Sequence, residues 1–287
     1  MTPKCEMFLR VLMNKYHQAA PEALLSGLPP EQAQAVLNVD NNSQDVSQAV
    51  IQSKEIVKHI HYSWLVPIIE GLSPQMQPLF LSSLPSVSSQ QLSKILKKPL
   101  HSTPLSPAVR LFLVNQLYAK IKPIDVLPVS YLPQTSMTVL LNYKKLELVE
   151  LIDFLGLYDL AEEIRHIVDK RYLKAIYNGL SIKKQHFLRI CLHHKEKLLP
   201  PRLGLEKWKG DSRELEKLLH QRGLIRLGKA LAGQHPDLVW HLSHRLDTGR
   251  GRLIQKYYAK EEIPGITQAL IQEILNLLNF FRKMSEK

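Results

Sequence analysis

A short helix-breaking segment occurs three times along the chain and restricts it to folds with closely spaced helix corners. Its centre is a Gly-Leu pair, found at Gly27-Leu28, Gly71-Leu72 and Gly179-Leu180. Apolar residues at helical spacing come before each pair. Pro or Ser, a Gln and a second apolar run come after it, the Gln residues being Gln32, Gln77 and Gln185. The pattern predicts a compact corner at which one helix stops and the next begins.

Each part of the corner has a local structural reason. Glycine is suited to the left-handed conformation just past the end of a helix, where a Cβ would be strained. Ser73 and Ser181 are suited to cap the next helix, and Pro30 and Pro74 to its first turn, where no N–H is needed. We therefore expect left-handed glycines and side-chain caps at these corners.

Weaker corners occur in residues 104–117, 130–143 and 231–246. Their uneven spacing is typical of a degenerate stack of helical hairpins that bury their apolar faces on one another. The alternative is a helical protein without repeats, which uses the same residue types to turn its corners. We expect an all-α fold of roughly twelve helices, arranged as stacked hairpins of the superhelical, armadillo-like kind.

Two proline-rich stretches, residues 99–107 and 125–133, interrupt the helical pattern. The second alternates β-branched residues, but its prolines favour an extended linker over a strand. A chain of 287 residues is long enough for two domains. We predict an N-terminal helical-repeat domain over residues 1–125 and a basic C-terminal helical domain over residues 126–287.

The positive charge of the chain is concentrated in one segment. The net charge is +12, and residues 165–229 carry 17 Lys and Arg against 6 Asp and Glu. Such a segment attracts an acidic protein, an anionic membrane surface or a phosphate backbone, or it is a solvated basic face. Within it, we expect Lys183, Lys184 and Arg189 to contact a partner.

Nucleic acid is the alternative partner for this basic segment. Its Lys and Arg residues, which could attract phosphates, are interleaved with Tyr172, Tyr177 and Phe187. However, Tyr177 and Phe187 fall at positions expected to pack inside a helical hairpin, and the basic excess does not recur in every repeat. A protein or lipid partner is therefore favoured over a nucleic-acid-binding helical-repeat protein.

The chemistry-bearing residues form no recognisable catalytic, cofactor or metal motif. No pair of neighbouring histidines has a third ligand at suitable spacing, the pairs being His59 and His61, His193 and His194, and His241 and His244. Cys191 lies in an apolar helical run, which is typical of a buried structural cysteine. Phosphate-binding glycine loops are absent from the sequence. We expect no enzyme activity and no bound metal or cofactor.

Other features favour a soluble, cytoplasmic protein. The two cysteines, Cys5 and Cys191, belong to no paired spacing, which is typical of a reducing compartment. Pro3, Lys4 and Glu6 interrupt any N-terminal signal peptide, and no run of about 18 apolar residues could span a membrane.

The C-terminal residues 265–284 have the pattern of one amphipathic helix. Pro264 or Gly265 opens it, and Arg282 and Lys283 close it, in agreement with the helix dipole. We expect its apolar stripe to pack on the domain, with a helix offered to a partner as the alternative. The stripe comprises Ile266, Leu270, Ile274, Leu277, Leu278 and Phe281, widened by Leu275 and Phe280.

Two of the corners resemble a known kind of repeat. The segment LLSGLPPEQAQAVL, residues 24–37, looks like the short helical repeats of the flagellar motor switch protein FliG and of the N-terminal domain of MgtE-type magnesium transporters. The segment IIEGLSPQMQPLFLSSLP, residues 68–85, resembles the same unit followed by a partner corner. Neither the charged torque helix of FliG nor the transmembrane half of the transporters is recognisable here.

A third segment, GQHPDLVWHLSHRL at residues 233–246, is similar to a Glu-His-Pro-Gln-Thr surface of the FliG middle domain. His235 and Pro236 match that motif, Gln234 replaces its acid, and Asp237 begins the part that differs. The resemblance implies that His235, Pro236 and Asp237 contact a partner.

The resemblance also implies a function. It points to a bacterial, non-enzymatic scaffold of the FliG type, such as the SctK class of adaptors of type III secretion sorting platforms. Such an adaptor links a cytoplasmic export complex to the membrane-ring base of a secretion or flagellar-type apparatus. The implied partners are acidic proteins of that platform and an anionic membrane surface, and the implied location is the cytoplasm, peripheral at the inner membrane.

Overall fold

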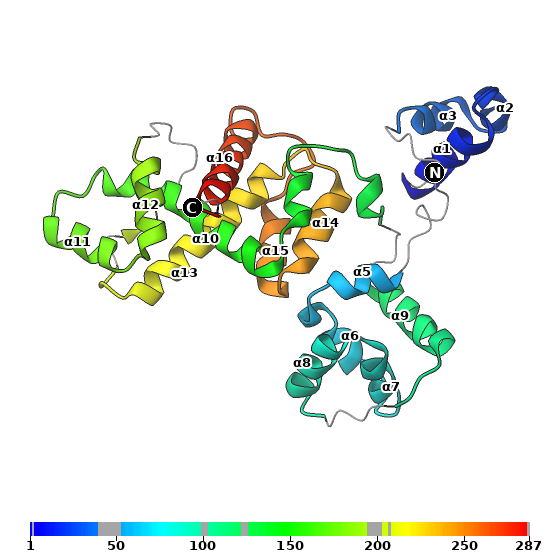
Figure 1. The fold of residues 1–287 in the computed structure, drawn as a ribbon, viewed down its shortest axis with the longest axis horizontal. Coiled ribbons are helices and arrows are strands. Elements are labelled where there is room, and N and C mark those ends of the chain that lie inside the picture. Colours follow the sequence, from blue (N-terminus) through cyan, green and yellow to red (C-terminus); the bar gives the residue numbers. More distant parts are fainter. Residues whose placement is uncertain are drawn as a thin grey trace. The chain divides into compact units, whose positions relative to one another are not determined.

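The computed structural model describes residues 1, 3–39, 53–98, 103–121, 126–193, 203–205 and 208–285. Over these ranges the chain forms 15 α-helices with short 3-10 turns and no strands (Figure 1). The all-α prediction is therefore confirmed, and the 15 described helices outnumber the roughly twelve that we expected. The chain divides into two compact units, Met1–Gln134 with His244–Thr248, and Thr135–Ser243 with Gly249–Lys287. The predicted boundary at residue 125 lies outside the described residues.

The first three helices of the first unit share a small core. They are α1 (Pro3–Tyr16), α2 (Pro21–Leu25) and α3 (Pro30–Leu37). Met13, Leu25 and Val36, one residue from each helix, are buried against one another. Pro30 is the first residue of α3, as predicted, because a proline there sacrifices no helical hydrogen bond.

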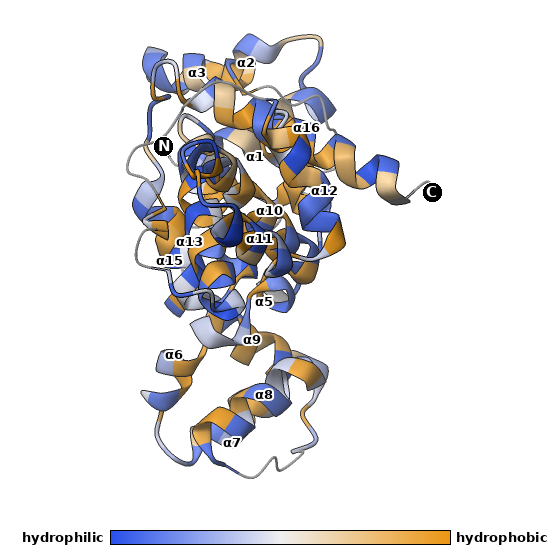
Figure 2. Cartoon of the chain, turned by 90° about the vertical axis from the view of Figure 1, so that its left-hand side faces the viewer, coloured by the Kyte–Doolittle hydropathy of each residue, from blue (hydrophilic) through white to orange (hydrophobic). Residues whose placement is uncertain are grey.

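The rest of the first unit is a cluster of short helices. It comprises α5 (Ser53–His59), the 3-10 turn η1 (Tyr62–Trp64), α6 (Val66–Glu70), α7 (Met76–Ser83), α8 (Ser86–Leu96), α9 (Pro107–Ile121) and the 3-10 turn η2 (Val129–Tyr131). Helix α9 packs on α5 and α7, and α8 packs on α6 and η1. Leu65, Ile69, Leu92 and Leu117 form much of the buried interior. Hydrophobic and hydrophilic residues alternate around these helices, as amphipathic packing requires (Figure 2).

The second unit is built around one long buried helix. Its elements are η3 (Thr138–Asn142), α10 (Lys145–Ile164), α11 (Lys170–Asn178), α12 (Ile182–Cys191), α13 (Ser212–Ala230), α14 (Pro236–Arg245), α15 (Thr248–Tyr257) and α16 (Thr267–Ser285). Helix α10 packs against α13, α12 and α16. Rings from three of these helices, Phe154, Phe187 and Phe280, meet with centroids 4.9 to 6.1 Å apart.

Two glycines let α10 and α13 approach closely. A Cβ on Gly156 would lie 2.1 Å from the Leu219 carbonyl oxygen, and one on Gly223 would lie 1.7 Å from the Ile152 carbonyl oxygen. Real side chains do not fit in such spaces, so the backbones are in direct contact at this crossing. The crossing holds the second unit together at its centre.

A buried ionic network joins three helices of this unit. Asp159 of α10 accepts hydrogen bonds from Arg222 and Arg226 of α13, and Arg226 also binds Glu273 of α16. Burial alone would lower the pKa of the Arg226 guanidinium, but the Glu273 and Asp159 carboxylates raise it above its ordinary value. Because each charge has a partner, the network can exist inside the fold.

The predicted corners form, but one part of the prediction is wrong. Gly71 and Gly179 have φ of −73° and −76°, in the right-handed region, and Gly27 is likewise not left-handed. The corners close instead through a tight turn, in which the Leu N–H donates to the carbonyl three residues earlier. These bonds run from Leu28 to Leu25 (2.9 Å), from Leu72 to Ile69 (3.1 Å) and from Leu180 to Tyr177 (3.1 Å).

The last two corners share a side-chain bond that the first lacks. The Gln77 amide donates to the Leu72 carbonyl at 2.9 Å, and the Gln185 amide donates to the Leu180 carbonyl at 3.0 Å. In both corners the sequence is Gly-Leu-Ser, followed by three variable residues and a Gln. Ala33 occupies the equivalent position in the first corner and has no amide to donate.

The predicted caps have mixed outcomes. Ser181 caps α12 as expected, since its hydroxyl accepts from the Lys184 N–H at 3.3 Å. The prediction for Ser73 and Pro74 is wrong, because α7 begins at Met76 with Gln75 as its N-cap. The Ser73 carbonyl instead accepts from the Met76 N–H, which forms a turn before the helix.

The C-terminal helix α16 packs on its unit as expected. Leu270, Ile274 and Leu277 are buried, which confirms the central line of the predicted stripe. Leu278 and Phe281 are only half-buried. The stripe is thus wider than the surface that the unit covers.

Candidate functional site

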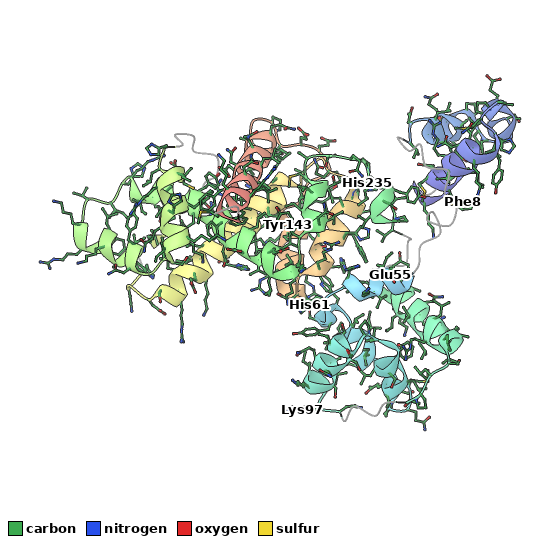
Figure 3. The ribbon with its side chains drawn as sticks, viewed as in Figure 1. Phe8, Glu55, His61, Lys97, Tyr143 and His235 are labelled. Carbon is green, nitrogen blue, oxygen red and sulfur yellow. The ribbon has the colours of Figure 1, made fainter. Side chains whose placement is uncertain are left out.

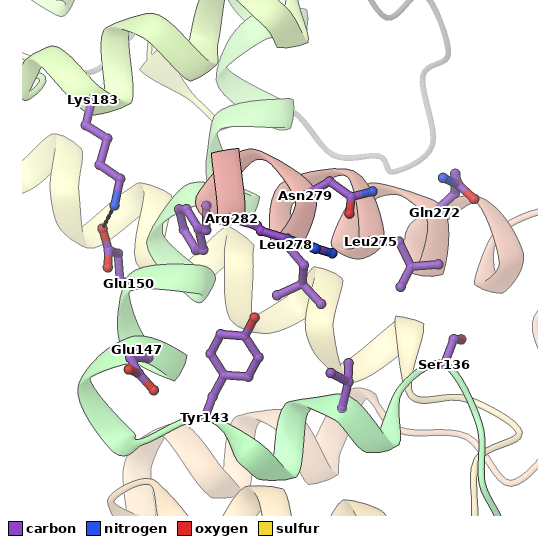
Figure 4. Close-up of a pocket in the computed structure, with 12 residues that line it drawn as sticks. Ser136, Tyr143, Glu147, Glu150, Lys183, Gln272, Leu275, Leu278, Asn279 and Arg282 are labelled. Atoms are coloured by element: carbon purple, nitrogen blue, oxygen red, sulfur yellow. Dashed lines mark hydrogen bonds and ion pairs between the residues drawn. The ribbon is translucent and has the colours of Figure 1, made fainter. Parts of the chain in front are cut away.

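The predicted contact residue Lys183 belongs to an ion pair within the protein. Its ammonium nitrogen lies 2.6 Å from the Glu150 carboxylate of α10, as Figure 4 shows. The same nitrogen lies 4.6 Å from the centroid of the Phe281 ring, at cation–π distance. The Lys183 side chain remains 37% exposed, so a partner could still reach it.

The Lys184 side chain is more buried than that of Lys183. Its ammonium nitrogen lies 3.5 Å from the Asp153 carboxylate and 4.0 Å from Glu216, and the side chain is only 11% exposed. Asp153 also binds the His220 ring at 2.6 Å, and Arg250 donates to the other nitrogen of that ring at 2.7 Å. The charge of Lys184 is therefore directed into this polar network.

Arg189 is exposed, near the other end of α12. Arg189 comes six positions after Lys183, and six positions correspond to about 240° around an α-helix. The two side chains therefore leave α12 on different faces. The structure does not bring Lys183, Lys184 and Arg189 together as one patch on this helix.

His235, Pro236 and Asp237 form the start of α14 (Figure 3). The Nδ1 atom of His235 accepts from the Asp237 N–H at 3.2 Å, and Pro236 is the exposed first residue of the helix. The Asp237 side chain is buried. Within the second unit, α14 and α12 lie well apart (Figure 1), so these residues do not join the lysines of α12 in one site.

Sequence reasoning missed the basic face of α11. Lys170, Arg171 and Lys174 are exposed on the side of α11 opposite the buried Ile176. Among the described residues none of these three cations has a carboxylate within ion-pair distance, and Asp169 uses its own carboxylate to cap the helix through the Arg171 N–H at 2.8 Å. The helical spacing of the three residues in the sequence could have identified this face.

Two exposed aliphatic residues precede and follow α11 in the sequence. Val168, before α11, is 92% exposed, and Ile182, at the start of α12, is 85% exposed. We define the basic tip as Lys170, Arg171 and Lys174 together with Val168 and Ile182.

A cavity of about 720 Å³ lies beside Lys183 (Figure 4). Leu275, Leu278 and Phe281, the uncovered edge of the α16 stripe, supply its apolar lining. Charged residues also line it, but Glu147 is engaged by the Lys144 N–H at 2.6 Å, and Glu150 by Lys183. The remaining lining residues are Ser136, Val139, Tyr143, Gln272, Asn279 and Arg282. The cavity can accept apolar side chains between polar walls.

Two observations concern metal-ligating groups and cysteine chemistry among the described residues. No group of three or more His, Cys, Asp or Glu side chains among them is placed to hold a metal ion. Cys191 is buried, as predicted, and burial raises the pKa of its thiol well above the ordinary value, which disfavours the reactive thiolate. None of the helices that the structure describes is both long and apolar enough to cross a membrane.

Comparison with protein-family models finds no match for this chain, and comparisons with curated proteins and with solved structures find none either.

Proposed function

We propose that the protein is a non-enzymatic scaffold or adaptor that docks an acidic partner through the basic tip of its second unit. The observation that carries this proposal is the set of unpaired cations on α11. Lys170, Arg171 and Lys174 are exposed without a carboxylate partner among the described residues, so their charge is available to another molecule. Charged surfaces of this kind accelerate association with partners of opposite sign.

The partner system follows from the sequence resemblance. The corners near Leu28 and Leu72 and the segment at His235 resemble FliG-type proteins. On that basis the adaptor links a cytoplasmic complex to the membrane-ring base of a type III secretion or flagellar-type apparatus in a bacterium, at the inner face of the membrane. The other predicted contacts are secondary in this proposal, namely Lys183, Lys184, Arg189 and the residues His235–Asp237.

We further infer that the fold consists of two domains of stacked helical hairpins. The recurrence of the Gly-Leu-Ser corner in both units, with the same Gln side-chain bond at Gln77 and Gln185, supports a common building block. A domain boundary near residue 125 belongs to this proposal.

A pull-down from native cells with a charge-reversed variant tests the docking proposal. The test variant is Lys170→Glu with Lys174→Glu. The matched control is Arg252→Glu with Lys260→Glu, two exposed cations in the same unit that give the same change in net charge. Reversal of Lys183 and Lys184 is a poorer test, because it also breaks ion pairs to Glu150 and Asp153.

We expect the test variant to recover several-fold less of an acidic platform protein than the wild type, while the control recovers an unchanged amount. Equal recovery with both variants would overturn docking at the basic tip. If the wild type instead retains nuclease-sensitive nucleic acid that salt releases steeply, the nucleic-acid alternative replaces the adaptor proposal.

A further inference from the structure

The start of α9 in the first unit is an apolar surface that this unit leaves uncovered. Residues 107–112 are all exposed, although helices of this kind normally bury one face. Val109, Leu111 and Phe112 are 45%, 49% and 60% exposed. Figure 2 shows hydrophobic colouring along α9. Val109 and Phe112 are one turn apart and share a face of α9, whereas Leu111 is about 100° from Phe112 around the helix.

A cavity of about 620 Å³ adjoins this surface. Its walls come from α5, the junction of α7 and α8, and α9. Leu111 lines the cavity and is also part of the exposed surface. Most of the lining is apolar, and the apolar residues are Val57, Leu84, Pro85, Leu105, Pro107, Leu111 and Val114. An apolar helix start beside an apolar cavity has the form of a groove that receives the hydrophobic face of another helix.

The charges around the cavity are positive. Lys58 and Arg110 are its charged lining residues, and no carboxylate is among the lining residues. Arg110 has no ion-pair partner within the described residues, and Lys58 meets only Glu55, at 3.8 Å, in a pair whose side chains are more than half exposed. Residues 53–121 as a whole carry seven Lys and Arg against two Glu. An acidic ligand therefore complements this groove, and a basic one is repelled.

We propose that this groove binds an amphipathic helix of a partner protein that has Asp or Glu residues along the edges of its apolar face. The apolar face packs on Leu111 and into the cavity that Leu111 lines, and the acidic edges meet Arg110 and Lys58. We name the proposed site the α9 groove. The α9 groove and the basic tip lie in different units and share no residue, so the failure of one proposal leaves the other standing.

A synthetic helix provides a direct probe for the full-length chain. The probe is a fluorescent peptide of about 18 residues, long enough to form a helix, with Leu at positions i, i+3, i+4 and i+7 and Glu along the edges of that stripe. A second peptide has Lys in place of every Glu. Binding is measured by fluorescence anisotropy at low and high salt.

The variants are matched in exposure and position. Leu111→Gln is compared with Ile95→Gln on α8, since Leu111 and Ile95 are 49% and 47% exposed and only Leu111 lines the cavity. Arg110→Glu is compared with Lys120→Glu, because both are exposed cations of α9 and only Arg110 lines the cavity. All four positions are on the surface, so the fold should tolerate each change.

We expect the acidic peptide to bind, and Leu111→Gln and Arg110→Glu each to weaken binding at least about tenfold, or about 1.4 kcal/mol. Ile95→Gln and Lys120→Glu should leave binding unchanged. Any of three results would overturn the proposal: no binding of the acidic peptide, equal binding of the basic peptide, or equal loss in the control variants. Concentration-dependent dimers that Leu111→Gln abolishes would also overturn it, because the occupant would then be a second copy of the chain.

Discussion

At the scale of single residues, glycine has two different roles in this protein. At Gly156 and Gly223 the absent side chain lets two helix backbones touch. At Gly71 and Gly179, the corner glycines, φ lies in the ordinary helical range, and a Cβ would meet nothing closer than 3.4 Å. The left-handed backbone conformation that we expected at these glycines occurs instead at Lys97, the C-cap residue of α8, where φ is 51°.

This difference can be tested by substitution with alanine. Gly223→Ala forces a Cβ toward the Ile152 carbonyl, which must push α10 and α13 apart, so we expect the free energy of unfolding to fall by about 3 kcal/mol. Gly179→Ala, in the same unit, should change it by less than about 1 kcal/mol. Urea unfolding followed by circular dichroism measures both. A large loss for Gly179→Ala would mean that the corner does require glycine.

At the scale of elements, the helix corners are held by bonds within a few residues. The Leu N–H turns back to the end of the first helix, and the Gln amide reaches back from the second helix to the Leu carbonyl. Such bonds satisfy backbone groups that a helix end leaves without partners. The Leu turn closes all three Gly-Leu corners, and the Gln bond is added at the second and third.

Removal of the corner amide should therefore destabilise the corner. In Gln77→Ala the part-buried Leu72 carbonyl loses its donor, and we expect the free energy of unfolding to fall by about 1 kcal/mol. Gln75→Ala is the control, because Gln75 is exposed and makes no side-chain cap; its effect should stay within about 0.5 kcal/mol. Equal losses in thermal or urea unfolding would show that the amide bond adds nothing to the corner.

At the scale of the whole molecule, charges serve two purposes. In the interior of the second unit, Asp159, Arg226 and Glu273 tie α10, α13 and α16 together. On the surfaces, cations without carboxylate partners occur in each unit, at Arg110 and at the basic tip, so each unit has its own proposed docking site. The buried set stabilises the fold only while every member is paired.

The buried ionic network and the surface ion pairs predict different losses of stability when a carboxylate of α10 is removed. Asp159→Ala leaves Arg222 buried without a carboxylate among the described residues and leaves Arg226 with Glu273 alone, and the free energy of unfolding should fall by about 3–5 kcal/mol. Glu150→Ala breaks a partly exposed pair with Lys183, and its cost should stay below about 1 kcal/mol. Urea unfolding of the two variants makes the comparison, and similar values would mean that the buried network contributes no more than a surface pair.

Features that depend only on neighbouring residues could be predicted from the local sequence pattern. The helical character, the cap at Ser181, the start of α3 at Pro30 and the positions of the corners all follow from side chains within a few residues of each other, so the local pattern was enough to predict them. The boundary of α7 was missed because Ser73 and Pro74 belong equally well to a turn or a helix start, and both choices satisfy the backbone.

Which charges are available to partners depends on how the helices pack in three dimensions. Lys183 and Lys184 pair with Glu150 and Asp153 of α10, about thirty residues earlier, and no local pattern reveals that pairing. Lys170 and Lys174 have no carboxylate of the described residues within ion-pair distance, and Leu111 stays exposed because no described helix covers it. Ion pairs and burial depend on distances between segments far apart in sequence, and packing alone sets those distances.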